Sequence, residues 1–248
     1  MNKYSKYLSE IASSMLKGQF GLPLRDCASC GQKRRFLVSG NESRSIRCLT
    51  CRSTAISLAT VSKIRQLPLD PKFSAVYELS YHGAVFRHLQ TSFANFTYSE
   101  YFGPPAGGAL VNGVRNEDVQ RLSFPDASFD LVSSTEVFEH VPDYIAGFAQ
   151  VRRVLRPGGW FVFTVPLFDD PQTRCVCRLG AGGQLVWVGT EEYHDSQVTG
   201  VGSVPVFWHH SKQQILVDLR TVGFASAELR VTSDFTPSVP QNVVVARR

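Results

Sequence analysis

The chain has 248 residues, of which 43% are hydrophobic, and it carries a net charge of +5. This length accommodates one α/β domain of ordinary size and a small second one, and the apolar content is sufficient for a core that folds unaided. No apolar run approaches the roughly 18 to 20 residues that span a bilayer, and the N-terminus lacks the apolar stretch and cleavage site of a signal peptide, so we expect a soluble, cytoplasmic protein without a membrane partner.

The N-terminal quarter of the chain is strongly basic. Residues 1–66 carry 12 Lys or Arg against 3 Asp or Glu, a net charge of +9, which leaves −4 for residues 67–248. Such asymmetry fits contact with a nucleic acid or another polyanion, and it fits a solvated positive surface equally well. The first element within this region is predicted to be a short amphipathic helix that ends at Gly18.

Four cysteines follow in two C-x2-C pairs. Cys27 and Cys30 form the first pair, Cys48 and Cys51 form the second, and 17 residues separate the two pairs. This spacing is typical of a tetrahedral zinc site, in which each pair occupies a tight turn. Disulfides are the alternative, but nothing else in the sequence indicates an oxidising compartment. We expect a zinc ribbon, and a structural one, because four thiolates leave no open position on the metal.

After a linking helix that ends near Pro68, the pattern changes to alternating strands and helices. Strands are predicted at 74–79, 95–102, 129–135 and 160–166, and helices at 83–90 and 143–155. This alternation predicts a parallel sheet with helices on both faces, whose ligands bind beyond the carboxyl ends of the strands. We therefore divide the chain into an N-terminal unit over 1–66, which holds the first helix, the ribbon and the linking helix, and an α/β domain over 67–248.

The segment "EDVQRLSFPDASFDLVSSTEVFEHVPDY", followed by "QVRRVLRPGGWFVFTVP", resembles the second half of a class I S-adenosylmethionine-dependent methyltransferase. The resemblance covers about residues 74–170 and rests on several motifs in the family's order. It implies a Rossmann-like fold with a mostly parallel, seven-stranded sheet. The layout of a ribbon followed by this domain further resembles a bacterial group of glycan and natural-product tailoring enzymes.

The resemblance assigns the cofactor's methionine and ribose parts to the ends of the first two strands. Glu78, Ser80 and Gly83 correspond to the glycine-rich turn beside the methionine part. This chain departs from the family's Gly-x-Gly there, since Gly83 is the glycine that remains, and the backbone approach that glycine allows is weakened. Glu100 corresponds to the acid that binds both ribose hydroxyls.

The adenine and methyl ends of the cofactor correspond to later residues. Asp118 falls where the family holds the adenine amino group, and Val119 is the expected ring contact. Ser134 and Glu136 would lie beside the transferred methyl group. For the three acids Glu78, Glu100 and Asp118, the alternative is a residue of a surface turn.

Titratable residues on the acceptor side are the candidates for catalysis. Glu139 and His140 follow the strand at 129–135 by one turn, and His140 is the first candidate for a general base, because its ordinary pKa lies near neutral pH. This Glu-His pair is common in the fold, so bracing of the loop is the alternative. An insertion at about 166–211 resembles a lid or binding loop. It contains His194, which is a candidate for the substrate pocket, and the alternative is that His194 is an ordinary histidine of a surface loop.

These features predict methyl transfer from S-adenosylmethionine to oxygen or nitrogen of a small molecule or sugar. The ribbon is expected to form one wall of the acceptor site or to mediate formation of a homodimer. Two alternatives remain open. The basic N-terminal unit fits an RNA methyltransferase, and the reduced glycine turn fits a relative of the fold that catalyses another reaction, such as a cyclisation.

Overall fold

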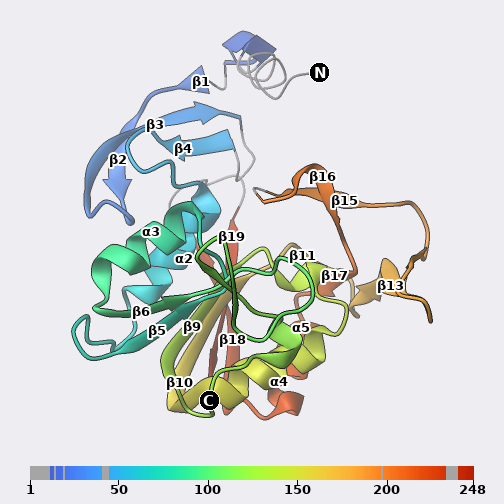
Figure 1. Ribbon diagram of the computed structural model, residues 1–248. Coiled ribbons are helices and arrows are strands. Elements are labelled where there is room, and N and C mark those ends of the chain that lie inside the picture. The colour runs from blue at the N-terminus through green and yellow to red at the C-terminus, as the bar shows by residue number, and fades with distance from the viewer. Residues whose placement is uncertain (1–11, 14, 19, 41–44, 197, 233–239) are drawn as a thin grey trace.

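The computed structural model describes residues 12–13, 15–18, 20–40, 45–196, 198–232 and 240–248 (Figure 1). The predicted N-terminal helix lies mostly outside the described residues, although residues 12, 13, 15 and 16 are helical. Among the described residues, no helix is both long and apolar enough to cross a membrane.

The N-terminal module is a four-stranded antiparallel sheet. Its strands are β1 (Phe20–Gly21), β2 (Leu24–Cys27), β3 (Gln32–Ser39) and β4 (Ile46–Cys48). β3 pairs with each of the other three. Its small core consists of Phe36, Ile46 and two cysteines packed against Leu58 of the next helix. A sheet of this size has little apolar surface to bury, so a further crosslink is expected to hold it together.

Helix α2 (Ala55–Ile64) joins this module to the larger domain. Thr54 caps its N-terminus, where its side chain accepts a hydrogen bond from the backbone of Ser57. Ala59, Val61 and Ile64 are buried in a cluster with residues of the large sheet. The helix that the sequence assigned to the N-terminal unit thus contributes to the core of the larger domain.

A six-stranded sheet forms the centre of the larger domain, with the order β18-β19-β10-β9-β5-β6. The strands are β5 (Ala75–Glu78), β6 (Asn95–Tyr98), β9 (Phe129–Thr135), β10 (Leu155–Thr164), β18 (Ser226–Thr232) and β19 (Gln241–Arg247). β6, β5, β9 and β10 are parallel, whereas β19 runs antiparallel to β10 and to β18. The predicted parallel arrangement is confirmed for these four strands.

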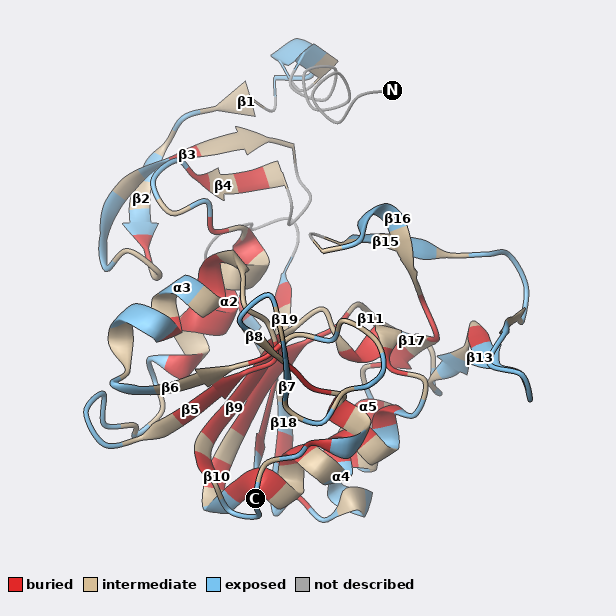
Figure 2. Cartoon of the chain, in the orientation of Figure 1, coloured by how far each residue is buried: buried red, intermediate tan, exposed pale blue. Residues whose placement is uncertain are grey.

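Helices cover both faces of this sheet. α2 and α3 (Gly83–Ser92) contribute to a core cluster on one face, while α4 (Tyr144–Val154) and α5 (Gln214–Val222) contribute to a larger cluster that contains many aromatic residues. Figure 2 shows the central strands as the most buried part of the molecule. The carboxyl ends of the parallel strands face the N-terminal module.

Three sequence expectations differ from the structure. Among the described residues the sheet has six strands rather than the predicted seven, because β8 (Val114–Asn116) forms a hairpin with β7 (Ala109–Val111) and contributes one parallel bridge, Asn116 to Glu100. The strand predicted over 95–102 ends at Tyr98. The helix predicted at 143–155 and the strand predicted at 160–166 leave residues 156–159 as a break, but these residues belong to β10 and form an irregularity in it, where the pairing register with β9 shifts between Leu155 and Trp160.

The insertion at 166–211 is composed of short strands. These are β11 (Leu167–Phe168), β12 (Arg174–Cys175), β13 (Cys177–Leu179), β14 (Leu185–Trp187), β15 (Tyr193–Ser196), β16 (Gly200–Pro205) and β17 (Trp208–Ser211). β15 and β16 form a hairpin, and the backbone N–H of Phe207 just beyond it donates to the carbonyl of Glu139, 2.8 Å away. The insertion is therefore attached to the loop that follows β9.

Candidate active site and cysteine cluster

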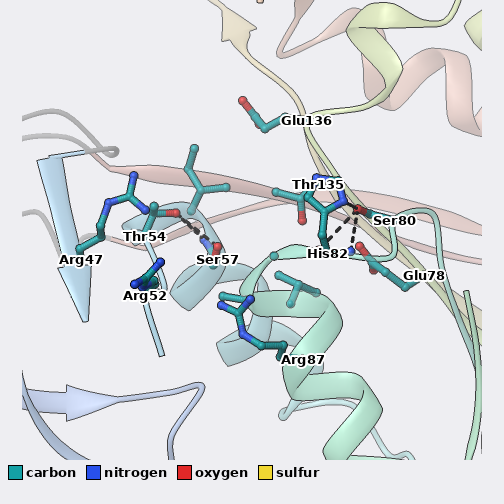
Figure 3. Close-up of a pocket in the computed structure, with 14 residues that line it drawn as sticks. Arg47, Arg52, Thr54, Ser57, Glu78, Ser80, His82, Arg87, Thr135 and Glu136 are labelled. Carbon is teal, nitrogen blue, oxygen red and sulfur yellow. Dashed lines mark hydrogen bonds between the residues drawn. The ribbon is translucent and has the colours of Figure 1, made fainter. Parts of the chain in front are cut away.

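A pocket of about 410 Å³ lies where the N-terminal module meets the carboxyl ends of β5 and β9 (Figure 3). Of the predicted cofactor residues, Glu78, Ser80, Gly83 and Glu136 line it. Its volume falls within the range of roughly 300 to 1,000 Å³ that is typical of small-molecule sites. The pocket therefore occupies the edge of the sheet at which ligands of parallel α/β folds bind.

Glu78 is the last residue of β5 and is 1% exposed. Burial raises the pKa of its carboxyl group to about 8, an effect that a hydrogen bond from the Ser133 hydroxyl opposes and the nearby Glu100 reinforces. At neutral pH and without a ligand this group is largely protonated. A positively charged ligand beside it would favour the carboxylate form.

The turn after β5 brings Ser80 and His82 to Glu100. The Ser80 hydroxyl lies 2.9 Å from Nδ1 of His82 and 3.5 Å from Oε2 of Glu100, and His82 Nδ1 lies 3.4 Å from that carboxylate oxygen. Gly83, which begins α3, has φ +92°, a conformation that L side chains rarely adopt. The sharp turn from strand to helix therefore depends on glycine here, although the usual Gly-x-Gly is missing.

Glu100 and Asp118 lie on neighbouring segments. The backbone N–H of Glu117 donates to the carbonyl of Glu100 at 3.0 Å, so Asp118 follows directly after this contact. Oδ1 of Asp118 caps a short 3-10 helix, η2 (Val119–Arg121), by accepting from the backbone of Gln120. The Val119 side chain is 8% exposed and belongs to the core, and neither Asp118 nor Val119 lines the pocket.

The residues at the end of β9 differ in their exposure. Ser134 is 0% exposed, so its side chain lies inside the fold rather than in the pocket, whereas Thr135 and Glu136 line the pocket. Glu136 has φ +55°, which is rare for a residue other than glycine. Such strained backbone clusters at functional sites, where the surrounding structure holds it in place.

Glu139, His140 and His194 form a cluster beyond the end of β9. Glu139 and His140 belong to the 3-10 helix η3 (Phe138–His140), and His194 comes from β15 of the insertion. The two imidazole rings approach to 3.2 Å, from His194 Nδ1 to His140 Nε2, and the Glu139 carboxylate is 0% exposed. Burial lowers the pKa of His140 to about 4, partly opposed by its contact with the carbonyl of Pro205. His140 is therefore neutral at physiological pH.

The four cysteines of the N-terminal module also come together. Their sulfur atoms all lie within 4.8 Å of one another, with Cys27 and Cys51 at 3.6 Å and Cys30 and Cys48 at 4.0 Å. Zn–S bonds of about 2.3 Å place tetrahedral sulfur atoms about 3.8 Å apart, so the spacing fits one zinc ion. A hydrogen bond with Cys27 lowers the pKa of the Cys51 thiol to about 4, so this thiol is a ready thiolate donor.

Three arginines of the pocket were not identified from the sequence as site residues. Arg47 and Arg52 come from the cysteine module and Arg87 from α3, and Figure 3 shows Arg47 and Arg52 across the pocket from the two glutamates. Arg87 also donates to the carbonyl of Cys51 at 2.7 Å, which fastens the module to the larger domain. The concentration of positive charge in residues 1–66 was the sequence signal that pointed to this wall.

Comparison with known families gives a match to the model described as "Methyltransferase domain" over residues 80–163. A fatty-acid O-methyltransferase of Mycolicibacterium smegmatis is 42% identical over 69 residues, which are 27% of this chain and 24% of that protein. A sterol 24-C-methyltransferase of Gibberella zeae is 43% identical over 131 residues, which are 42% of this chain and 34% of that protein. The chain thus spans about a quarter to a third of these relatives' length.

Among solved structures, the [4+2]-cyclase SpnF is similar with a TM-score of 0.52 at 13% identity, covering 98% of this chain and 94% of that one. At this identity the likeness shows the fold alone. The strand order, the likeness to this structure and the match over residues 80–163 together show the class I, Rossmann-like methyltransferase fold. The matched segment begins at residue 80, so the cysteine module lies outside it.

Proposed function

We propose that this protein transfers the methyl group of S-adenosylmethionine to an oxygen or nitrogen atom of a small molecule or sugar. The observation that carries the proposal is the pocket at the carboxyl ends of β5 and β9, which is lined in part by residues of the segment 80–163 that matches a methyltransferase domain. The named relatives act on a fatty acid and a sterol, which favours a small acceptor over RNA.

The charges around the pocket fit the methionine part of the cofactor. That part carries an ammonium and a sulfonium on one side and a carboxylate on the other. Glu136 supplies negative charge on one wall of the pocket, Glu78 beside it can ionise when a positively charged group binds, and Arg47 and Arg52 supply positive charge on the opposite wall. Charge-assisted hydrogen bonds from guanidinium groups to a carboxylate are among the stronger polar contacts in proteins.

The adenosine part would bind along the adjacent edge of the sheet. Glu100 is the group proposed to accept hydrogen bonds from the ribose hydroxyls, since it follows β6 and lies within 3.5 Å of Ser80, which lines the pocket. Asp118 is proposed to bind the adenine amino group, with the backbone of Val119 beside the ring. Ser134 is proposed to contribute through its backbone, because its side chain is enclosed.

When bound, the cofactor supplies an electrophilic methyl group, and transfer then requires an acceptor atom held in line with it. We assign Glu139, His140 and His194 to the acceptor side. The insertion positions two of these groups, because His140 Nδ1 lies 2.8 Å from the carbonyl of Pro205 and His194 itself belongs to β15. A neutral imidazole nitrogen can accept a proton from the acceptor or bind a metal ion.

The four cysteines are proposed to hold a structural zinc ion. Two observations support this: the sulfur spacing fits tetrahedral coordination, and the module's apolar core is small. The zinc would fix the loop between Cys48 and Cys51, whose neighbour Arg52 lines the pocket. The ion therefore acts on the active site indirectly, by holding one wall in place.

The activity is tested with S-adenosylmethionine carrying a labelled methyl group and a panel of small hydroxyl, amine and sugar acceptors, with bulk RNA as a separate arm. Label in a small product supports the proposal. Label confined to RNA, with activity that falls steeply as salt rises, would instead indicate a nucleic-acid acceptor. A product that retains no label, formed only when the cofactor is present, would indicate a different reaction on the same fold.

A further inference from the structure

The cluster of Glu139, His140 and His194 has a second property that the reaction proposed above does not require. One carboxylate oxygen and two imidazole nitrogens come together there, and the three ligand atoms lie within 4.8 Å of one another. The residues come from segments 54 positions apart in the chain, η3 and β15, so the fold rather than local sequence brings them together.

We propose that these three residues form a second metal site, which binds a divalent transition-metal ion through Oε1 of Glu139, Nε2 of His140 and Nδ1 of His194. The site is separate from the four-cysteine cluster, and it goes beyond the proposed function, because binding of the ion does not depend on which reaction the domain catalyses.

The spacing of the three atoms fits one ion. The distances are 3.2 Å between the two nitrogens, 3.6 Å from His140 Nε2 to Glu139 Oε1, and 3.7 Å from His194 Nδ1 to the same oxygen. Metal–ligand bonds of about 2.0 to 2.1 Å place tetrahedral ligand atoms about 3.3 to 3.4 Å apart. An ion therefore fits between the three atoms with movements of a few tenths of an ångström.

The surroundings of both rings orient them as ligands. His140 Nδ1 lies 2.8 Å from the carbonyl of Pro205, a contact in which the ring nitrogen must be the donor, and this leaves a lone pair on Nε2. On the other ring, His194 Nε2 lies 3.7 Å from Oε1 of Glu192, and His209 Nε2 lies 2.7 Å from the other oxygen of that carboxylate. A ligand histidine commonly donates its remaining N–H to a carbonyl or carboxylate. His140 makes this bond to Pro205, whereas the Glu192 carboxylate lies near His194 but beyond hydrogen-bond distance.

The chemistry of the ligands restricts the ion. Two imidazoles and one carboxylate suit zinc, iron, cobalt or manganese, and they do not suit calcium, which prefers oxygen ligands. Three protein ligands leave open positions for water or for an oxygen of the acceptor. Binding of an acceptor oxygen to the ion rests on the proposed function, whereas binding of the ion itself does not.

The alternative is a proton-sharing pair, in which His194 Nδ1–H donates to His140 Nε2 and His140 serves as a general base. The two readings exclude each other, because Nε2 of His140 cannot bind an ion and accept a proton at the same time. Metal content therefore distinguishes them directly, without knowledge of the acceptor.

The experiment uses the full chain, equilibrated by dialysis with micromolar free zinc and analysed for zinc per chain. We expect two zinc ions in the parent protein. His194→Ala and Glu139→Gln are each expected to lose one ion and to keep the other. Glu191→Gln is the matched control, because Glu191 lies in the same insertion and contacts Tyr193 but supplies no atom to the cluster, and it should retain two.

Affinity and fold are measured on the same samples. Titration calorimetry with zinc should show the weaker of the two sites disappearing in His194→Ala, with a loss of at least ~10-fold in affinity. Binding of S-adenosylhomocysteine in the variants shows that the domain is folded and reports on the proposed function separately. A parent chain that binds no zinc, cobalt or manganese beyond the cysteine site, or a second ion that His194→Ala and Glu139→Gln both retain, would overturn the proposal.

Discussion

Glu78→Gln is the change whose consequence follows most directly from the structure. The carboxyl group of Glu78 is 1% exposed at the end of β5, and burial raises its pKa from 4.5 to about 8. Between these two pKa values the folded chain holds a proton that the unfolded chain releases, so the free energy of unfolding falls as the pH rises through this window. The raised pKa therefore lowers the free energy of unfolding, relative to a Glu78 with an ordinary pKa, by about 3 kcal/mol at pH 7 and by about 1 kcal/mol at pH 5.

Glutamine removes the titrating group but keeps an oxygen that can accept the hydrogen bond from Ser133. We therefore expect the stability of Glu78→Gln relative to the parent to increase by about 2 to 3 kcal/mol between pH 5 and pH 7. Urea unfolding followed by tryptophan fluorescence measures this, since all three tryptophans belong to the larger domain. Glu228→Gln is the control, because its side chain is 52% exposed. Parallel pH curves for the parent and Glu78→Gln would refute a buried, protonated Glu78.

Three further outcomes are expected. Glu100→Ala should weaken binding of S-adenosylhomocysteine by ~1.5 to 3 kcal/mol through loss of charge-assisted hydrogen bonds, and an unchanged dissociation constant in calorimetry would remove Glu100 from the ribose site. Arg47→Ala should weaken the same binding by ~1 to 2 kcal/mol, because Arg47 lines the pocket. Lys33→Ala removes one positive charge outside the pocket and should leave the binding unchanged. Equal effects of the two changes would mean that only the net charge of the protein matters. Cys27→Ser should release about one zinc per chain and destabilise the N-terminal module, and full zinc content in that variant by elemental analysis would count against the ribbon.

The sequence was informative where one local pattern decides the structure. The strand at 129–135 is continuous and apolar because it lies in the middle of the sheet, and it was predicted with its observed bounds. Helix α4 was predicted within one residue at each end, because its apolar face is regular and Asp143 caps its N-terminus. The sequence predicted a seventh strand because it does not show which partner β8 pairs with. Both β7 and the edge of the sheet offer backbone hydrogen bonds to β8, and in the structure β8 pairs with β7.

The candidate site depended more on contacts between distant segments. Glu139, His140 and His194 were each identified from the sequence, but their convergence depends on the insertion docking through Phe207 onto the loop after β9. The arginine wall was missed because it requires the cysteine module to lie against α3, a placement fixed by the contact of Arg87 with Cys51. Charge counting indicated a basic module without showing which face it presents.

The central claim is that the edge of the sheet between β5, β6 and β9 binds S-adenosylmethionine. Calorimetric titration of the folded, zinc-loaded chain with S-adenosylhomocysteine tests it most directly. We predict one site per chain with a dissociation constant in the micromolar range or tighter. Absence of any binding heat at high micromolar ligand, confirmed by an unchanged melting temperature at the same concentration, would contradict the claim.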